Sequence, residues 1–387
     1  MKKYRIFGTL RRSAALVALV VAGAVGVTAS PTQAQDRVYV TNQGEATISI
    51  IDVAQLEVIE TLDLKPLGFS ENAKPHHIAV EPDGSFWYVS LIGENHVLKF
   101  DRNNQLVAQA EFEVPGMLAL DGSSDMLYVG RSMSAVNPPM RIGAINRSDM
   151  SIDEIDVLFP RPHALIVHPS GEQVYSASLG MNRMGAVDAE SWDVEFVDVP
   201  GETRALVQFA VSPDGQTLAV TGELTGDLLV FDLTGDPAAP QLQRAVEVGS
   251  RPWHPIFGRD DRHVYFGNKG DNTLVEVDVV EGRVSRTFSA PGIDQPHGAA
   301  LSPDGRLLFI SNNGPGGMGM NHGPDGMGDA AMDHGALDHG AMDHGDHEAS
   351  VSYETGTVAV VELASGEVVA MIPVGKNATG IGAASPR

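Results

Sequence analysis

Five methionines and five histidines gather between Asn313 and Val351, in a stretch without lysine, arginine or aromatic residues. Imidazole suits copper, zinc and nickel, whereas thioether selects Cu(I), so this mixture favours copper over zinc or nickel. The units Met-Asp-His-Gly and Leu-Asp-His-Gly recur with a five-residue period, which does not line one face of a helix. We therefore expect residues 314–350 to be a disordered, flexible metal chelator with several sites. The candidate ligands are Met318, Met320, His322, Met327, Met332, His334, His339, Met342, His344 and His347.

A second set of five histidines stands just before tight-turn motifs. Pro-Asp-Gly or Pro-Ser-Gly turns begin at Pro82, Pro169, Pro213 and Pro303, and two degenerate turns fill the gaps between them. Counted back from these turns, the histidines occupy two equivalent positions. The first position is shared by His76, His163 and His297, and the next by His77 and His254.

The turns reveal the elements that must position these histidines. They recur about every 44 residues, each a few residues before a short apolar strand, so the chain is a repeat protein. Each unit contains four short strands, which predicts an all-β fold, a seven-bladed β-propeller with four-stranded blades. The chain enters at the second strand of blade one, residues 38–41. Residues 378–385 are left over as the first strand of that blade, so the ring closes without an open edge.

The strand sequences carry a family resemblance. Tyr39-Val40-Thr41-Asn42 spells the YVTN repeat, and degenerate copies begin at Tyr88, Tyr128, Tyr265 and Phe309. From residue 35 onward the chain resembles the YVTN-repeat family of bacterial seven-bladed propellers. That family includes binding proteins, scaffolds and relatives of enzymes, so the resemblance implies the fold and leaves the function open. The Met-Asp-His-Gly units resemble the Met/His-rich stretches of bacterial periplasmic copper-resistance proteins.

The propeller geometry should bring the second set of histidines together. The innermost strands line the central channel, so these side chains should converge at one mouth from blades two, four, six and seven. The 314–350 insertion lies in the second-to-third strand turn of blade seven, which opens on the same face. We expect a metal shared by His254, His297 and either His76 or His77, or one completed by the insertion.

Nitrous oxide reductases hold a copper cluster on histidines of a seven-bladed propeller, and this arrangement is similar. Those enzymes also need a copper domain with cysteine ligands, and this chain has no cysteine. Met117 occupies the equivalent position in blade three, where it is either a ligand or a core side chain, and we expect a core side chain. His96, His168 and His263 fall on other strands or turns and are expected to be structural.

A lactonase-like hydrolase is an alternative function. Lys74-Pro75-His76-His77 resembles the Pro-His and His-His sequences before the Pro-Asp-Gly turn of seven-bladed 6-phosphogluconolactonase-type enzymes. That resemblance implies that His76 or His297 activates water. Arg161, Arg204 or Arg251 at the channel mouth would then bind the anionic substrate or stabilise an oxyanion.

A protein-binding scaffold is the third function class, and in it the ring histidines would only pack and hydrogen-bond. A partner would use the broad top face, where the innermost strands begin and which we call the entry face. The chain carries no nucleotide, haem or flavin motif, and no such cofactor is expected.

The first 34 residues are typical of a secretory signal peptide. Five basic residues precede an apolar stretch over 14–27, and Thr32-Gln33-Ala34 offers small residues for cleavage. The apolar stretch is too short for a membrane span. Arg11-Arg12 lacks the bulky apolar residues of a twin-arginine signal, so we expect Sec export and a periplasmic or secreted protein. Residues 35–387 should then form a single propeller domain.

The charge of the chain limits its partners. The full sequence has a formal charge of −24, and removing residues 1–34 takes away five basic residues and no acid, giving −29. Nucleic acid and anionic membranes are therefore poor partners. A metal ion or a periplasmic protein on the entry face fits better, and we expect a monomer.

Overall fold

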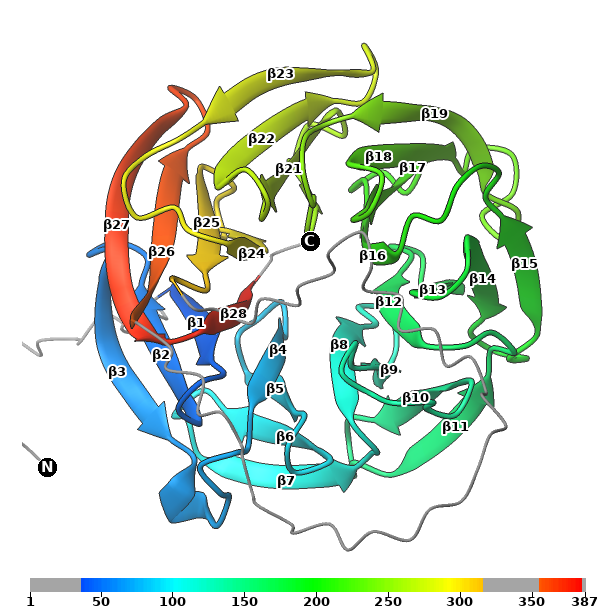
Figure 1. Cartoon of the computed structure of the whole chain (residues 1–387). Helices are drawn as coiled ribbons and strands as arrows, with labels where there is room; N and C mark the ends of the chain where they lie inside the picture. The colour runs from blue at the N-terminus through cyan, green and yellow to red at the C-terminus, as the bar shows by residue number, and fades with distance from the viewer. Residues whose placement is uncertain (1–35, 316–354, 385–387) are drawn as a thin grey trace, which may run out of the picture. The chain divides into compact units, whose positions relative to one another are not determined.

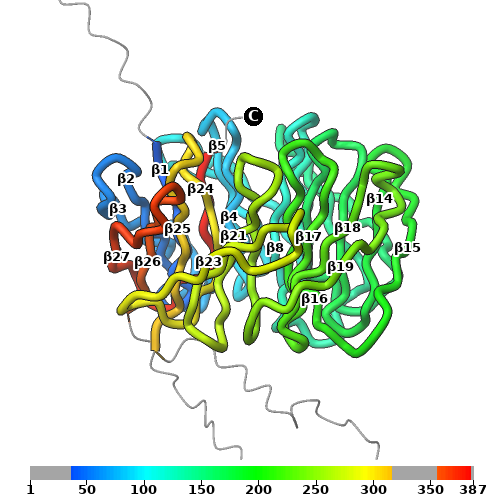
Figure 2. Tube along the Cα trace, turned by 90° about the horizontal axis from the view of Figure 1, so that it is seen from above, coloured from blue at the N-terminus to red at the C-terminus, as the bar shows by residue number. Residues whose placement is uncertain are grey.

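Seven four-stranded antiparallel blades form a ring in the computed structural model, which describes residues 36–315 and 355–384 (Figure 1). The strands run between the two faces of the ring (Figure 2). This confirms the predicted all-β, seven-bladed propeller. Among the described residues no helix is long and apolar enough to cross a membrane. The predicted leader and the Met and His ligands of the insertion lie outside the described residues.

The strands of each blade are named here in order from the innermost strand outward. Blade one contains β28 (Ala378–Ala383), β1 (Arg37–Asn42), β2 (Thr47–Asp52) and β3 (Glu57–Asp63), and the 3-10 turn η1 (Lys65–Leu67) follows. Blade two contains β4 (Pro75–Val80), β5 (Phe86–Leu91), β6 (His96–Asp101) and β7 (Leu106–Glu111). Blade three contains β8 (Pro115–Leu120), β9 (Met126–Arg131), β10 (Arg141–Asn146) and β11 (Ile152–Asp156). Blade four contains β12 (Pro162–Val167), β13 (Gln173–Ser178), β14 (Arg183–Asp188) and β15 (Val194–Asp198). Blade five contains β16 (Leu206–Val211), β17 (Thr217–Gly222), β18 (Asp227–Asp232) and β19 (Gln241–Glu247). Blade six contains β20 (Ile256–Phe257), β21 (His263–Asn268), β22 (Thr273–Asp278) and β23 (Arg283–Phe288). Blade seven contains β24 (Pro296–Leu301), β25 (Leu307–Asn312), β26 (Thr355–Glu362) and β27 (Glu367–Lys376).

The Pro-Asp-Gly turns join the first and second strands of their blades. In blade seven Gly305 has a φ of 73°, which glycine adopts without steric cost, and it donates its N–H to the Ser302 carbonyl at 2.8 Å. The Asp304 carboxylate accepts hydrogen bonds from the Ser302 hydroxyl and the Arg306 N–H. The turn residues that revealed the repeat therefore fix the start of each second strand.

Apolar clusters fill the seven interfaces between neighbouring blades. The middle strands face two interfaces, so both of their faces are buried, as in the all-buried pattern of β2. At the interface of blades one and two, Trp87 stacks on Tyr39 and Phe100 with ring centroids 4.8 and 4.3 Å away. The core is thus a ring of clusters around the channel.

The C-terminal strand closes the ring as predicted. β28 pairs antiparallel with β1, with Val40 opposite Ile381, and it also lies beside β4 and β24. The Thr379 and Thr41 hydroxyls are 2.8 Å apart, and Ile381 is buried. The observed strand ends at Ala383, and Ser385, where the predicted strand ended, lies outside the described residues.

Blade six departs from the repeat at its innermost strand. β20 has only two residues, whereas the other innermost strands have six. Pro255, just before it, has no N–H for strand pairing. Pro252 makes an isolated bridge with Asn268. Trp253 and His254 lie between this bridge and β20, outside regular strand geometry.

Deleting residues 375–387 should destabilise or aggregate the protein, because it removes the innermost strand of blade one and exposes the pairing edge of β1. Loss of buried side chains such as Ile381 should lower the melting temperature by at least about 5 °C. Deleting only 385–387 is the control and should leave the melting curve unchanged. Equal melting temperatures for both truncations would contradict this closure.

Candidate functional site

Seven equivalent turns build the channel mouth on the entry face. The residue before each innermost strand, or in blade six before the isolated bridge of Pro252, has a positive φ of 47–55°, which is uncommon for residues other than glycine. These residues are Lys74, Val114, Arg161, Ala205, Arg251, Gln295 and Asn377. Each of their carbonyl oxygens accepts a hydrogen bond of 2.9–3.2 Å from the first N–H after the second strand. The donors are Gln43, Ile92, Ser132, Leu179, Glu223, Lys269 and Asn313, which we call the rim.

Three histidines meet inside this rim. The second residue after each positive-φ residue is Thr379, His76, Gly116, His163, Val207, Trp253 or His297. The His76 ring centroid lies 6.5 Å from that of His163 and 5.9 Å from that of His297. The predicted convergence of these side chains is therefore observed. Because the residue of blade one is a small threonine, His76 and His297 can meet across that blade.

His254 and His77 extend the group toward the channel. The ring centroid of His254 is 4.6 Å from that of His297 and 6.0 Å from that of His77. His76, His77, His163, His254 and His297 together form one imidazole cluster. Except for His77, which is partly buried, their side chains are buried.

The imidazole cluster separates two cavities. The entry cavity has a volume of about 30 Å³ and opens to solvent, and it is lined by His76, His297, Trp253 and Lys269. His77 and His254 line a second cavity among the innermost strands. A ligand that enters from the mouth therefore meets His76 and His297 first.

Hydrogen bonds fix which ring nitrogens carry protons. A carbonyl oxygen only accepts, so the Nδ1–H of His163 donates to the Arg131 carbonyl at 2.8 Å. The Nδ1 of His76 likewise donates to Gln43 Oε1 at 3.2 Å. In both rings Nε2 then carries a lone pair, as in a metal-binding histidine. In His77, Nδ1 instead accepts the Leu118 N–H at 3.2 Å, so its lone pair is already used.

Two ring nitrogens at the entry cavity lack partners. Nε2 of His76 and Nδ1 of His297 are buried, and the described residues give neither a hydrogen bond. Buried polar atoms are nearly always paired, so each such atom calls for an explanation. Both residues line the same cavity, which makes an external ligand the simplest one.

Burial keeps the imidazole cluster neutral. Desolvation holds the pKa of His76, His254 and His297 well below the usual histidine value, and neighbouring imidazoles and Lys269 add to the effect. Desolvation also lowers the pKa of His163 to about 4 and that of His77 to about 3. Neutral imidazole is the form that binds a metal or accepts a proton.

The cluster does not form a complete metal site by itself. Within residues 36–315 and 355–384, no group of three His, Asp or Glu side chains is placed to hold a metal ion. The shared site expected for His254, His297 and His76 or His77 is therefore not assembled as the side chains lie.

Lys269 and Trp253 also line the entry cavity, although neither was predicted as a site residue. Lys269 is 8% exposed, and its Nζ lies 4.4 Å from the centroid of the Trp253 ring. Trp253 also packs on His297, with centroids 5.5 Å apart. Rim residues vary from blade to blade, so the repeat did not mark Lys269. Trp253 was detectable only as the blade-six equivalent of His76.

The three arginines of the hydrolase alternative differ in placement. Only Arg251 lines the entry cavity, and it binds the Glu223 carboxylate through Nε and Nη2 at 3.0 and 2.8 Å. Arg204 pairs with Asp227 at 3.1 Å, and Arg161 donates to the Met133 carbonyl at 2.9 Å. Each arginine thus already has a protein partner.

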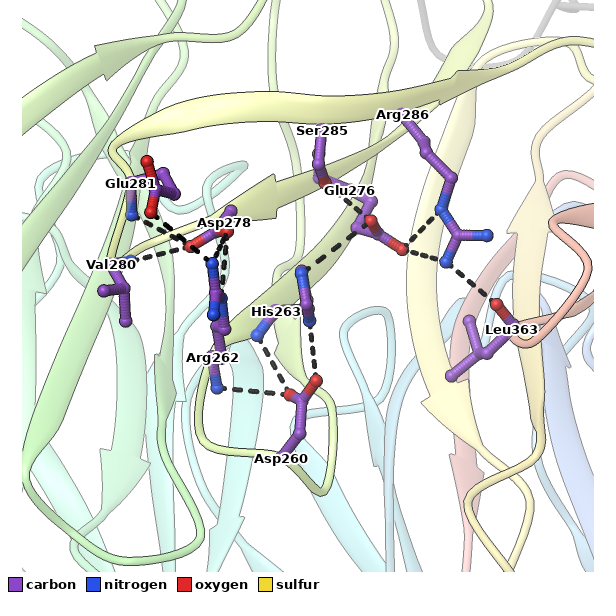
Figure 3. Close-up of polar contacts among 10 residues, drawn as sticks. All are labelled: Asp260, Arg262, His263, Glu276, Asp278, Val280, Glu281, Ser285, Arg286 and Leu363. Atoms are coloured by element: carbon purple, nitrogen blue, oxygen red, sulfur yellow. Dashed lines mark hydrogen bonds and ion pairs between the residues drawn. The ribbon is translucent and has the colours of Figure 1, made fainter.

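The other histidines have structural contacts. His263 lies between Asp260, 2.6 Å from its Nδ1, and Glu276, 4.0 Å from its Nε2, in a polar network of blade six (Figure 3). His168 joins blades four and five through Nε2 and the Gly215 carbonyl, 2.9 Å apart. The His96 Nδ1 bonds the Glu94 carbonyl, and Met117 is fully buried in the core.

Comparisons with known proteins support the fold. No protein-family model matches the chain. The solved structure of a functionally unknown protein from Desulfotomaculum acetoxidans DSM 771 superposes with a TM-score of 0.67, 16% identity and coverage of 91% of this chain and 100% of that one. A streptogramin B lyase structure gives a TM-score of 0.59, 15% identity and coverage of 71% and 86%. At these identities the likeness is one of fold.

One curated protein is related in sequence over part of its length. A 6-phosphogluconolactonase of Enterobacter sp. (strain 638) is 26% identical over 118 residues, which is 30% of this chain. The match spans about a third of that relative, 35% of its length.

The neutral imidazoles predict acid lability. The pKa of His163 in the folded protein, about 4, is below the unfolded value of about 6.5, so its contribution to stability is complete above pH 6.5 and declines as pH falls toward 4. Across that window His163 alone should remove about 3 kcal/mol. His163→Gln, whose amide can still donate to the Arg131 carbonyl, should show a shallower decline in urea unfolding. Met117→Leu is the non-titrating control, and a profile for His163→Gln parallel to that control would contradict the assignment.

Proposed function

We propose that this chain is an exported metal-binding β-propeller that takes up a transition metal ion, copper first, at the entry cavity. The observation that carries the proposal is the pair of unpartnered buried nitrogens on His76 and His297, which line one cavity. In this role the protein is a carrier or buffer of the ion, and the ion is its cargo.

The chemistry of the pair favours a metal. Leaving a buried acceptor unpaired costs about 1–3 kcal/mol, which a bound ion would offset. The hydrogen bond from His76 Nδ1 to Gln43 orients the ring and leaves the lone pair of Nε2 free to bind a metal, as outer-shell partners do in metal sites. Because both pKa values are depressed, no proton has to leave the two rings at neutral pH.

The sequence offers further ligands next to this pair. Asn313 lines the entry cavity, and the Met/His-rich insertion begins at the next residue. A chelating segment attached at the cavity has a high effective concentration there. Its thioether groups are the reason for placing Cu(I) ahead of zinc and nickel.

Replacing both imidazoles should remove the tightest site. We expect His76→Gln/His297→Gln to weaken the highest copper affinity at least about tenfold, because both prepared nitrogens are lost. Competition with a chelator on full-length protein, purified without an affinity tag, would measure it. His263→Gln is the matched control, since His263 lies in the blade-six network away from the channel, and it should bind as the parent does. Equal highest affinities in the double variant and the parent would rule out the cavity as the metal site.

A lactonase-type hydrolase is the second candidate, favoured by the partial match to the 6-phosphogluconolactonase. Neutral His76 or His297 could act as the general base, and Lys269 and Arg251 would face an anionic substrate. The same variants separate the candidates. Lactone hydrolysis by chelator-treated parent that is lost in the double variant would favour the hydrolase.

A further inference from the structure

Lys269 is a buried cation whose ammonium lacks a hydrogen-bonding partner. Lys269 is only 8% exposed, and its Nζ lies 4.4 Å from the centroid of the Trp253 ring. Among the described residues Nζ makes no hydrogen bond or ion pair. A cation–π contact compensates only part of the cost of removing an ammonium from water.

The neighbouring charges do not neutralise Lys269. Glu223 is the nearby carboxylate, and Arg251 already holds it with two hydrogen bonds. When Lys269 is protonated, as it is at a pH below its pKa of about 7, the three side chains together leave one positive charge at the cavity. Burial is the main reason that the pKa of Lys269 falls to about 7; Arg251 lowers it further, and Glu223 opposes the shift.

A second donor in the same cavity is also unpaired. The indole N–H of Trp253 is buried, can only donate, and has no partner among the described residues. Trp253 is 4% exposed, and both Trp253 and Lys269 line the entry cavity. An unpaired buried indole N–H beside an ammonium that has no carboxylate partner matches an anion.

We propose that the entry cavity holds a small monovalent anion, either chloride or the carboxylate group of a small acid, against the Lys269 ammonium and the Trp253 indole N–H. One uncompensated positive charge matches a monovalent ion better than phosphate or sulfate. Arg251 adds to the positive potential without giving up Glu223. The site goes beyond the proposed metal uptake and does not depend on it.

Chloride NMR linewidth on the metal-free full-length protein would test this site, with added formate as the competing carboxylate. We expect excess broadening with the parent that is lost in Lys269→Met. The control is Lys65→Met, which removes an exposed lysine paired with Asp63 and should behave as the parent. Displacement by formate would identify a shared site, and broadening that formate does not displace would identify a chloride site.

Two further results would decide the matter even if Lys269→Met failed to fold. Lys269→Arg keeps the charge and should retain excess broadening above that of buffer. A parent protein with no excess broadening, or with the same excess in folded Lys269→Met, would overturn the anion site. Copper titration of the same proteins keeps the two proposals separate. The parent protein tests each of them independently, because a parent that binds copper but shows no excess broadening would overturn the anion site and leave the metal proposal standing.

Discussion

Pairing between β28 and β1 is the constraint on which the channel mouth depends. The strand comes from the far end of the chain, and it separates β24, which carries His297, from β4, which carries His76. A Cβ on Gly380 would lie 2.1 Å from the His76 carbonyl oxygen, so only glycine allows this close approach. Thr379 follows the same logic, because a small residue there lets the two imidazoles meet. Closure of the ring and assembly of the site are therefore one event.

Burial sets the chemistry of the site once the ring has closed. It keeps five imidazoles neutral, and it leaves the Lys269 ammonium with an aromatic ring in place of a carboxylate. A folded protein normally avoids unpaired polar atoms of this kind. The unpaired atoms of His76, Trp253 and His297 share one mouth of the channel, where a ligand can enter, whereas others, such as the Trp87 indole nitrogen, lie elsewhere in the blades. Their position therefore favours a role in binding over a role in holding the blades together.

Much of the fold could be predicted from the sequence because its signals are local. Turns such as the one at Gly305 have a characteristic residue pattern. Because this pattern recurs along the chain, it predicts the successive blades and the strand that closes the ring. The convergence of His76, His163 and His297 followed from the same count. Side-chain hydrogen bonding could not be predicted in this way. The repeat places His76 and His77 at different positions, but it does not show that Nδ1 of His77 accepts a backbone N–H whereas Nε2 of His76 is unpaired.

Lys269 shows the other limit of the sequence. Its importance comes from its rim position and from Trp253 beside it, and the chain at that rim position is otherwise Gln, Ile, Ser, Leu, Glu or Asn. Blade six also departs from the repeat after Pro252, so the count alone did not show how Trp253 would lie. The polar groups that decide which ligand binds are set by contacts between blades, which a repeat pattern does not encode.

X-ray absorption of the copper-loaded protein, with residues 314–350 replaced by a short glycine-containing turn, tests the central claim most directly. Lengthening or shortening such a loop costs little free energy, about 0.6 kcal/mol per doubling, so the propeller should still fold. The account predicts bound copper with imidazole scattering that disappears in the His76→Gln/His297→Gln form. Copper that binds the shortened protein without imidazole scattering, or that does not bind it at all, would contradict the account.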